Sequence, residues 1–216
     1  ELTLRQHEIL QGISEQCRVL TRLVSRLMDI SRLEAGTYRL QMERIHVEDL
    51  VTGTVRAFDL LAERQGVRLT TRIEESAPST IVLDVDVVRQ EILGNLISNA
   101  IKFTPEGGEV RITVRGSGDK LVFRVSDTGP GIPPDHHEHV FQKYYQVDRS
   151  RRMGAGLGLA IVRELTSAHG GRVELIPAPE PGLGAVFDVY LSAEAEDWED
   201  VRASHQVVTT APVGAD

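Results

Sequence analysis

The sequence contains one cysteine and one tryptophan, and aromatic residues make up only 5% of its 216 positions. A single thiol, Cys17, cannot form an intramolecular disulfide and has no second thiol for a metal site. Because Cys17 falls within a helical apolar pattern, we expect a buried core thiol. This cysteine usage fits a protein of the reducing cytoplasm.

Long apolar runs are also absent, since none reaches the length of about 20 residues that a membrane-spanning helix needs. The first residues lack the basic start and apolar core of a signal peptide. The chain begins with Glu1 rather than Met and already has a helical pattern there. We therefore expect a cytoplasmic fragment of a longer protein, with any membrane anchor upstream of it.

Basic residues are too few to balance the acids, and the formal net charge of −8 argues against a nucleic-acid partner. Residues 192–216 carry much of this charge, with six acidic residues and one arginine. Because this segment also has little apolar content, we expect a mobile acidic tail with a solvated Trp198. The body of the chain is nearly neutral, so its charge says little about a partner.

Residues 1–34 have the pattern of one long helix. Apolar side chains step alternately by four and three positions from Leu2 to Ile30, and a second column at Leu10, Cys17 and Val24 widens the stripe. A stripe this wide favours a helical bundle over a two-stranded coiled coil. The helix, about 50 Å long, needs a partner helix from missing sequence or from a second copy. Gly36 is placed to end it.

Residues 37–191 predict an α+β fold: a two-layer α/β sandwich with a mixed sheet of about five strands and helices on one face, preceded by the long coiled-coil or bundle helix. Strands are expected at 38–44, 67–73, 80–83, 110–115, 121–126, 172–176 and 185–191. Helices are expected at 47–65, from Asp84 or Asp86 to Ala100, near 134–140, and at 157–169. The chain thus divides into residues 1–36, 37–191 and 192–216.

Glu91, Asn95 and Asn99 recur every four residues, so they share one face of the helix expected to end near Ala100. A carboxylate and two amides are costly to bury without partners. Mg²⁺ carrying phosphates would supply partners, because it prefers oxygen ligands and keeps several waters. Lys102 would bring a positive charge to the phosphates. The alternative is a hydrated helix face.

The segment Asp127-Thr128-Gly129-Pro130-Gly131 follows an expected strand. An aspartate at the end of a strand, next to glycines, can accept a hydrogen bond from a flat amine that is pressed against bare backbone. Asp, Gly and Pro also dominate ordinary turns, so a plain turn is the alternative.

The segment Gly154-Ala155-Gly156-Leu157-Gly158 runs into the helix expected at 157–169. Glycines let backbone N–H groups approach phosphate oxygens, and a helix N-terminus adds partial positive charge. The pattern overlaps with a dinucleotide fingerprint but opens no βαβ unit. The alternative is a flexible linker.

Residues 141–152 lie between the two glycine-rich segments, with aromatic residues at the base of the span and Arg149, Arg151 and Arg152 near its tip. This arrangement suits a hinged lid over a nucleotide. The alternative is that the aromatic residues belong to the core.

In this order and spacing, the four segments resemble the catalytic domain of sensor histidine kinases. That domain belongs to the superfamily that also holds DNA gyrase, a heat-shock chaperone and mismatch-repair ATPases. The resemblance covers about residues 38–191. Residues 1–36, which end in Asp29-Ile30-Ser31-Arg32-Leu33-Glu34-Ala35-Gly36, look like the second helix of the family's dimerisation hairpin and the linker after it.

The resemblance implies ATP and Mg²⁺ as cofactors and gives each motif a role. The implied catalytic residues are Glu91, Asn95 and Lys102. Asn95 and Asn99 would hold Mg²⁺ and phosphates, Glu91 would help to orient Mg²⁺ or the nucleophile, and Asp127 would accept the adenine amine. The other implied nucleotide-binding residues are Gly129, Gly131, Ile132, Tyr145, Arg149, Gly154, Gly156, Leu157 and Gly158.

Two positions depart from the family pattern. Gln146 stands where many members carry an arginine that reaches the γ-phosphate, a role that Arg149 or Arg151 would have to take over. The phosphoacceptor box, a His-Glu/Asp-Leu-Arg-Thr-Pro-like segment, is absent: His7-Glu8 matches its first two letters only, and too few residues follow for a two-helix hairpin. We therefore expect the acceptor histidine upstream of Glu1.

These features predict a homodimeric histidine kinase of a two-component signal-transduction system. This transferase would move the γ-phosphoryl group of Mg·ATP to a histidine and then, in a phosphorelay, to an aspartate of a response regulator. An ATP-hydrolysing clamp of the gyrase or chaperone type is the alternative, favoured by Glu91 and opposed by residues 1–36. A third alternative is a non-catalytic regulatory module that has kept the fold, which the four intact nucleotide-binding segments oppose. A serine kinase of the anti-sigma type shares the nucleotide motifs but not residues 1–36.

Overall fold

A computed structural model of the chain describes residues 3, 5–6, 12–14, 17, 21, 24, 28, 31–33, 35, 37–147, 155–178 and 182–192. Several predictions lie outside the described residues. They concern the acidic tail with Trp198, His7, Gly36, Arg149, Arg151, Arg152 and Gly154.

Seven strands and the helices between them make up the described part of the chain from residue 43 onward. In chain order the elements are β1 (Glu43–His46), α2 (Val47–Arg56), α3 (Asp59–Arg64), β2 (Arg68–Ile73), β3 (Thr80–Leu83), the π-helix η1 (Val87–Leu93), α4 (Gly94–Phe103), β4 (Glu109–Ser117), β5 (Lys120–Asp127), the short 3₁₀ helix η2 (Pro134–His136), α5 (Gly158–Ala168), β6 (Arg172–Ile176) and β7 (Val186–Ser192).

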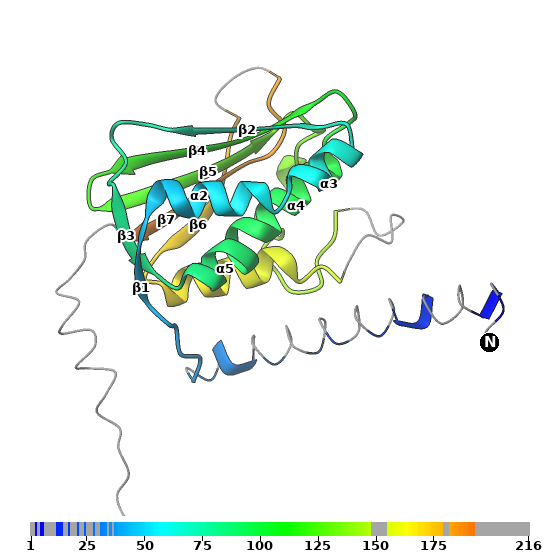
Figure 1. Cartoon of the computed structure of the whole chain (residues 1–216), viewed down its shortest axis with the longest axis horizontal. Helices are drawn as coiled ribbons and strands as arrows, with labels where there is room; N and C mark the ends of the chain where they lie inside the picture. The colour runs from blue at the N-terminus through cyan, green and yellow to red at the C-terminus, as the bar shows by residue number, and fades with distance from the viewer. Residues whose placement is uncertain are drawn as a thin grey trace, which may run out of the picture.

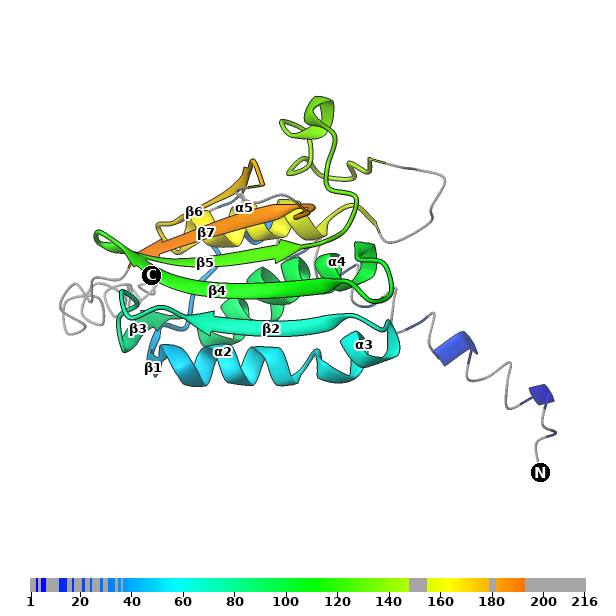
Figure 2. The ribbon, with the colours of Figure 1, turned by 90° about the horizontal axis from the view of Figure 1, so that it is seen from above.

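Five of the strands form one mixed sheet in the order β2-β4-β5-β7-β6, and β1 pairs separately with β3. The β2–β4 pair is parallel, and the other pairs in this sheet are antiparallel. Figure 2 shows the five strands side by side, and Figure 1 shows α2, α4 and α5 together on one face of the sheet. The predicted two-layer α/β sandwich with helices on one face is confirmed.

The core lies between this sheet and the helix layer. Along β4, buried Val110, Ile112 and Val114 alternate with outward residues, as expected for a strand with one covered face. Each buried aliphatic or aromatic side chain stabilises the fold by about 1.5–3 kcal/mol. Further side chains of this core are Leu121, Phe123, Val189, Leu191, Leu96, Ile97, Ile101, Ile161 and Leu165.

The helix expected to end near Ala100 lies where it was predicted, but its first part is wider than an α-helix. Val87–Leu93 is π-helical, and the N–H of Gly94 bonds to the carbonyl of Arg89, five residues back. A Cβ at Gly94 would lie 3.0 Å from that carbonyl oxygen, so glycine suits this turn. Asp84 caps the helix through its Oδ1, which accepts the N–H of Val87 at 3.0 Å. The side chain of Asp86, the other expected cap, does not cap it.

Three other predicted boundaries are wrong. The single helix expected at 47–65 is two helices, because the N–H of Phe58 bonds back to Val55 and its ring packs 3.6 Å from the Cβ position of Gly94. The strand expected at 38–44 is only Glu43–His46, where pairing with β3 begins. The short helix near 134–140 is regular only at Pro134–His136.

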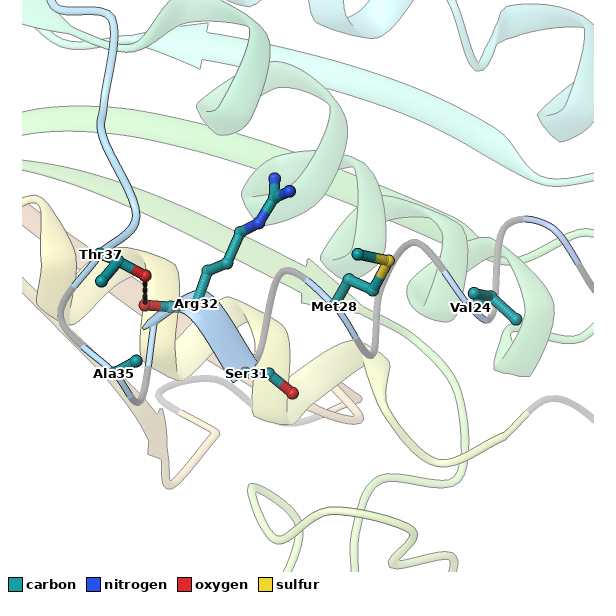
Figure 3. A pocket seen from close by; sticks show the side chains of 6 residues that line it. All are labelled: Val24, Met28, Ser31, Arg32, Ala35 and Thr37. Carbon is teal, nitrogen blue, oxygen red and sulfur yellow. Dashed lines mark hydrogen bonds between the residues drawn. The ribbon is translucent and has the colours of Figure 1, made fainter.

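Within residues 1–36, nearly all described positions are helical, but one continuous helix stays a prediction. Cys17 is exposed in the single chain, so its expected burial is wrong for an isolated copy. Ile13, Val24 and Met28 are also about half exposed. Figure 3 shows an open hollow lined by Val24, Met28, Ser31, Arg32, Ala35 and Thr37. Among the described residues, no helix is long and apolar enough to cross a membrane.

Candidate functional site

Asn95 lies in the first turn of α4 and is buried, with 8% of its surface exposed. Its side-chain Nδ2 donates a hydrogen bond to the backbone carbonyl of Glu91 and lies 3.4 Å from Glu91 Oε2. Glu91 and Asn95 therefore lie on the same face of the helix, as predicted. Asn99, one turn further on, and Lys102 are half-buried on the same helix. Burial lowers the pKa of the Lys102 amine, because it disfavours the charged form.

Asp127 is the buried last residue of β5, and a single oxygen of its carboxylate accepts both of its backbone hydrogen bonds. Its Oδ1 accepts the backbone N–H groups of Gly129 at 2.8 Å and of Ala185 at 3.1 Å. Within the described part of the chain, Oδ2 accepts no hydrogen bond and so remains available to a donor. Burial raises the pKa of the Asp127 carboxyl, and the two N–H groups act against that rise.

The backbone around Asp127 has no room for side chains. A Cβ at Gly129 would lie 2.8 Å from the carbonyl oxygen of Phe103, and a Cβ at Gly184 would lie 2.4 Å from Asp127 Oδ1. Gly131 has a φ of 72°, which favours glycine. The next residue, Ile132, is partly buried against the core, and its carbonyl accepts a hydrogen bond from His137 at 2.7 Å. These glycines therefore let the backbone of Phe103, Gly129 and Gly184 pack closely around Asp127.

Gly184 and Ala185 were not among the predicted site residues. The N–H of Gly184 bonds to the carbonyl of Asp127 at 2.6 Å, and Ala185 supplies one of the two donors to Asp127 Oδ1. The available signal was the glycine pair Gly182-Leu183-Gly184 just before the last strand.

The start of α5 lies against Asn95. A Cβ at Gly158, the first residue of α5, would lie 3.2 Å from Asn95 Oδ1. Leu157, just before it, is buried. At the other end of α4, the carbonyl oxygen of Phe103 would lie 2.8 Å from a Cβ on Gly129, so Phe103 and Gly129 pack closely. The helix α4 thus reaches from the glycine-rich segment before α5 to the one after β5, with Asn99 and Lys102 between them.

The described ends of the predicted lid meet. The N–H of Tyr144 bonds to the carbonyl of Gly156 at 2.8 Å, and a Cβ at Gly156 would lie 2.8 Å from the carbonyl oxygen of Tyr145. The hydroxyl of Tyr145 hydrogen-bonds to Nδ1 of His136 on η2. Tyr144 has a φ of 64°, a conformation uncommon for a non-glycine residue. Arg149 and Gly154 lie outside the described residues.

The described residues contain no group of three or more His, Cys, Asp or Glu side chains that could hold a metal ion. The predicted Mg²⁺ ligands are a different set, two amides and one carboxylate on one helix. That set fits an ion that keeps waters and phosphate oxygens in its coordination shell. Gly158 lets the start of α5 approach Asn95 closely, since a Cβ there would lie 3.2 Å from Asn95 Oδ1.

Comparison with known proteins identifies one family. Residues 84–195 match the sequence model described as "Histidine kinase-, DNA gyrase B-, and HSP90-like ATPase". The chain is 39% identical over 174 residues to hybrid signal transduction histidine kinase D of Dictyostelium discoideum. This alignment covers 77% of the chain and 11% of that protein. It is 35% identical over 194 residues to the circadian input-output histidine kinase CikA of Synechococcus elongatus. This alignment covers 88% of the chain and 25% of that protein.

Among solved structures, full-length ShkA in complex with AMPPNP superposes with a TM-score of 0.77 at 31% identity, covering 90% of this chain and 41% of that one. The Acinetobacter baumannii histidine kinase AdeS superposes with a TM-score of 0.71 at 21% identity, over 90% of this chain and 87% of that one, and shares the fold. The chain spans at most a quarter of the two curated relatives.

Proposed function

Because the chain belongs to the family of histidine kinase-, DNA gyrase B- and HSP90-like ATPases and is the ATP-binding catalytic core of a sensor histidine kinase, we propose that it binds Mg·ATP along α4. The adenine end is Asp127 with its glycines, and the phosphate end is the junction of Asn95 with the start of α5. The observation that carries this proposal is Asp127 Oδ2, an acceptor beside backbone without side chains.

At the adenine end, Asp127 is held rigidly because Oδ1 takes two backbone donors. Its Oδ2 is then placed to accept the exocyclic amine of adenine. Gly129 and Gly184 keep the backbone beside Asp127 free of side chains, so an aromatic base would be able to lie against it. We assign Gly131 and Ile132 to the wall of the same pocket, where Ile132 supplies an apolar edge.

At the phosphate end, the first backbone N–H groups of α5 are unsatisfied within the helix and attract phosphate oxygens. Gly158 brings that backbone to Asn95, and we assign Gly156 and Leu157 to the same phosphate-binding segment. Asn99, Asn95 and Glu91 would hold Mg²⁺ with the phosphates, and Lys102 would contact a phosphate whose charge offsets the burial of its amine. Bound Mg²⁺ would neutralise charge on the transferred group.

The chain's own task in the reaction is positioning. The bond between the γ-phosphorus and the β–γ bridging oxygen breaks, a bond to an imidazole nitrogen forms, and ADP leaves. The imidazole must be neutral, which its ordinary pKa of about 6.5 allows at pH 7. Holding the phosphates between Asn95 and Gly158 aligns the γ-phosphoryl group for that attack. Tyr145, tied to His136, would anchor the lid. Arg149 would contact the nucleotide from the lid, and Gly154 would join the glycines that cradle the phosphates.

The remaining parts of the assignment concern the whole protein. We propose that residues 1–36 are the second helix of a dimerisation hairpin and its linker, 37–191 the catalytic domain, and 192–216 an acidic tail. The exposed Val24 and Met28 support pairing of that helix with a partner helix in a homodimer. The phosphoryl group would pass from a histidine upstream of Glu1 to a response regulator in the cytoplasm.

Radiolabel transfer separates this function from the clamp-type ATPase, which the histidine kinase relatives do not favour. With Mg·[γ-³²P]ATP, the 216-residue chain should bind nucleotide without steady turnover and without acid-labile label. A chain extended upstream should become labelled. Steady hydrolysis by the short chain would support the clamp. Label that disappears in His7→Gln would instead make His7 the acceptor.

A further inference from the structure

Asp84 and His169 form a buried pair far from each other in sequence, and no step of the proposed function uses them. Asp84 follows β3 and precedes η1, and His169 follows α5. They are 7% and 9% exposed. The backbone N–H of Asp84 donates to His169 Nε2 at 3.3 Å, and His169 Nδ1 lies 2.7 Å from the carbonyl oxygen of Leu165 in α5.

These contacts determine the protonation of the imidazole. A backbone N–H can only donate, so Nε2 must accept and carries no proton. Nδ1 then carries the proton that is donated to Leu165. Burial lowers the pKa of His169, which agrees with a neutral ring. His169 therefore joins the last turn of α5 to Asp84, with both ring nitrogens in use.

The carboxylate of Asp84 adds two further connections. Its Oδ1 accepts the N–H of Val87 in η1 at 3.0 Å. Its Oδ2 accepts the N–H of Gln41 at 2.8 Å. Gln41 belongs to the segment that leads from residues 1–36 into β1, and in this segment Tyr38 and Leu40 pack against the core. One carboxylate thus ties this segment to the start of η1.

The pair lies at one end of two helices whose other parts build the nucleotide site. The helix α5 packs against η1 and α4, and it runs from Gly158, beside Asn95, to His169, beside Asp84. Eleven residues of α-helix span about 16 Å. A change in how the two helices meet at Asp84 and His169 would therefore shift Gly158 relative to Asn95.

We propose that Asp84 and His169 are positioning residues of the nucleotide site: they fix η1–α4 against α5 and connect both helices to the segment that follows residues 1–36. This role deepens the proposed function and rests on the Mg·ATP site described above. Neither residue touches the nucleotide. Their contribution is the spacing between Asn95 and the first N–H groups of α5.

Two isosteric variants separate positioning from simple stability. His169→Gln can place an amide oxygen near the Nε2 position and accept the Asp84 N–H. His169→Asn can donate to Leu165 but cannot reach Asp84. Gln41→Pro removes the N–H that Asp84 Oδ2 accepts, although it also replaces the Gln41 side chain and fixes φ at that position. Val189→Ala weakens the sheet core without changing any hydrogen bond of Asp84 or His169, and it serves as the control for lost stability.

The experiment combines calorimetric titration of the 216-residue chain with Mg·ATP, the melting temperature, and NMR signals of the Asn95 side-chain amide and the Gly158 backbone amide without nucleotide. His169→Asn should weaken binding about five- to tenfold and shift both signals, and His169→Gln should stay within about twofold of the wild type. Gln41→Pro should shift both signals in the same direction as His169→Asn. Val189→Ala should lower only the melting temperature.

A His169→Asn chain with a lower melting temperature but unchanged affinity and unmoved signals would overturn the positioning role. Unmoved signals in Gln41→Pro would overturn the connection to the segment after residues 1–36. A wild-type chain that does not bind Mg·ATP would overturn the proposed function instead. In that case the NMR shifts, recorded without nucleotide, would still decide on the positioning role.

Discussion

Gly158, the first residue of α5, lies directly against the side chain of Asn95 in α4: a Cβ on Gly158 would be 3.2 Å from Asn95 Oδ1. This contact brings the glycine-rich segment before α5 to the helix that carries the proposed Mg²⁺ ligands. The sequence motifs that were separately ambiguous are adjacent in space at this point.

Gly158→Ala should weaken Mg·ATP binding roughly tenfold, a loss of about 1.4 kcal/mol. The new methyl group would press on Asn95 Oδ1 and narrow the space for phosphate oxygens. Titration calorimetry checks this. The matched control is Gly53→Ala in α2, where a Cβ would lie 3.0 Å from the flexible end of Arg89. Equal loss in the two variants would show that the effect is general destabilisation.

Asn99→Ala should reduce ATP affinity in Mg²⁺ about tenfold or more and have little effect in EDTA, because the amide is proposed to act through the metal. Hydrogen bonds and ligands to charged groups contribute roughly 1.5–3 kcal/mol. Ser98→Ala, the adjacent half-buried position on the same helix, is the control. An identical loss with and without Mg²⁺ would contradict a metal-linked role for Asn99.

Stability should fall more steeply below pH 6.5 in the wild type than in His169→Gln. Burial lowers the pKa of His169 in the folded chain, so the unfolded chain binds a proton first as the pH decreases. The contribution of neutral His169 is thus complete above about pH 6.5 and is lost as the pH falls toward the folded-state pKa. Urea unfolding at pH 7.5 and 5.5 measures the free energy of unfolding of both chains and hence this contribution. The same pH dependence of the unfolding free energy in the wild type and in His169→Gln would contradict this role of His169.

Periodicity and turn chemistry predicted most of the fold. The alternation of Val110, Ile112 and Val114 gave a strand with one buried face, and Gly66 and Gly170 follow the ends of α3 and α5. The π-helical turn at Val87–Leu93 could not be predicted, because helical spacing of apolar residues does not distinguish a bond to the fourth residue back from one to the fifth. The break near Phe58 depends on its contact with Gly94, which is a tertiary contact.

The site was predictable where a motif is continuous, as with Asp127-Thr128-Gly129. Gly184 and Ala185 were missed because their role depends on the pairing of β5 with β7, which brings them to Asp127. The pair of Asp84 and His169 was missed for the same reason: neither residue stands in a motif, and only packing of α5 on η1 joins them. The burial expected for Cys17 needs a partner helix, which a single chain does not supply.

The most direct test of the central claim is a calorimetric titration of Mg·ATP into the wild-type chain and into Asp127→Asn. The asparagine oxygen can still accept the N–H groups of Gly129 and Ala185, but its amide group replaces the acceptor Oδ2 with a donor. The wild type should bind one ATP, and Asp127→Asn should bind about ten- to hundredfold more weakly. The exposed control Asp119→Asn, at the β4–β5 turn, should bind like the wild type. Equal affinity of the wild type and Asp127→Asn would contradict the adenine site, and with it the account of how this chain holds ATP.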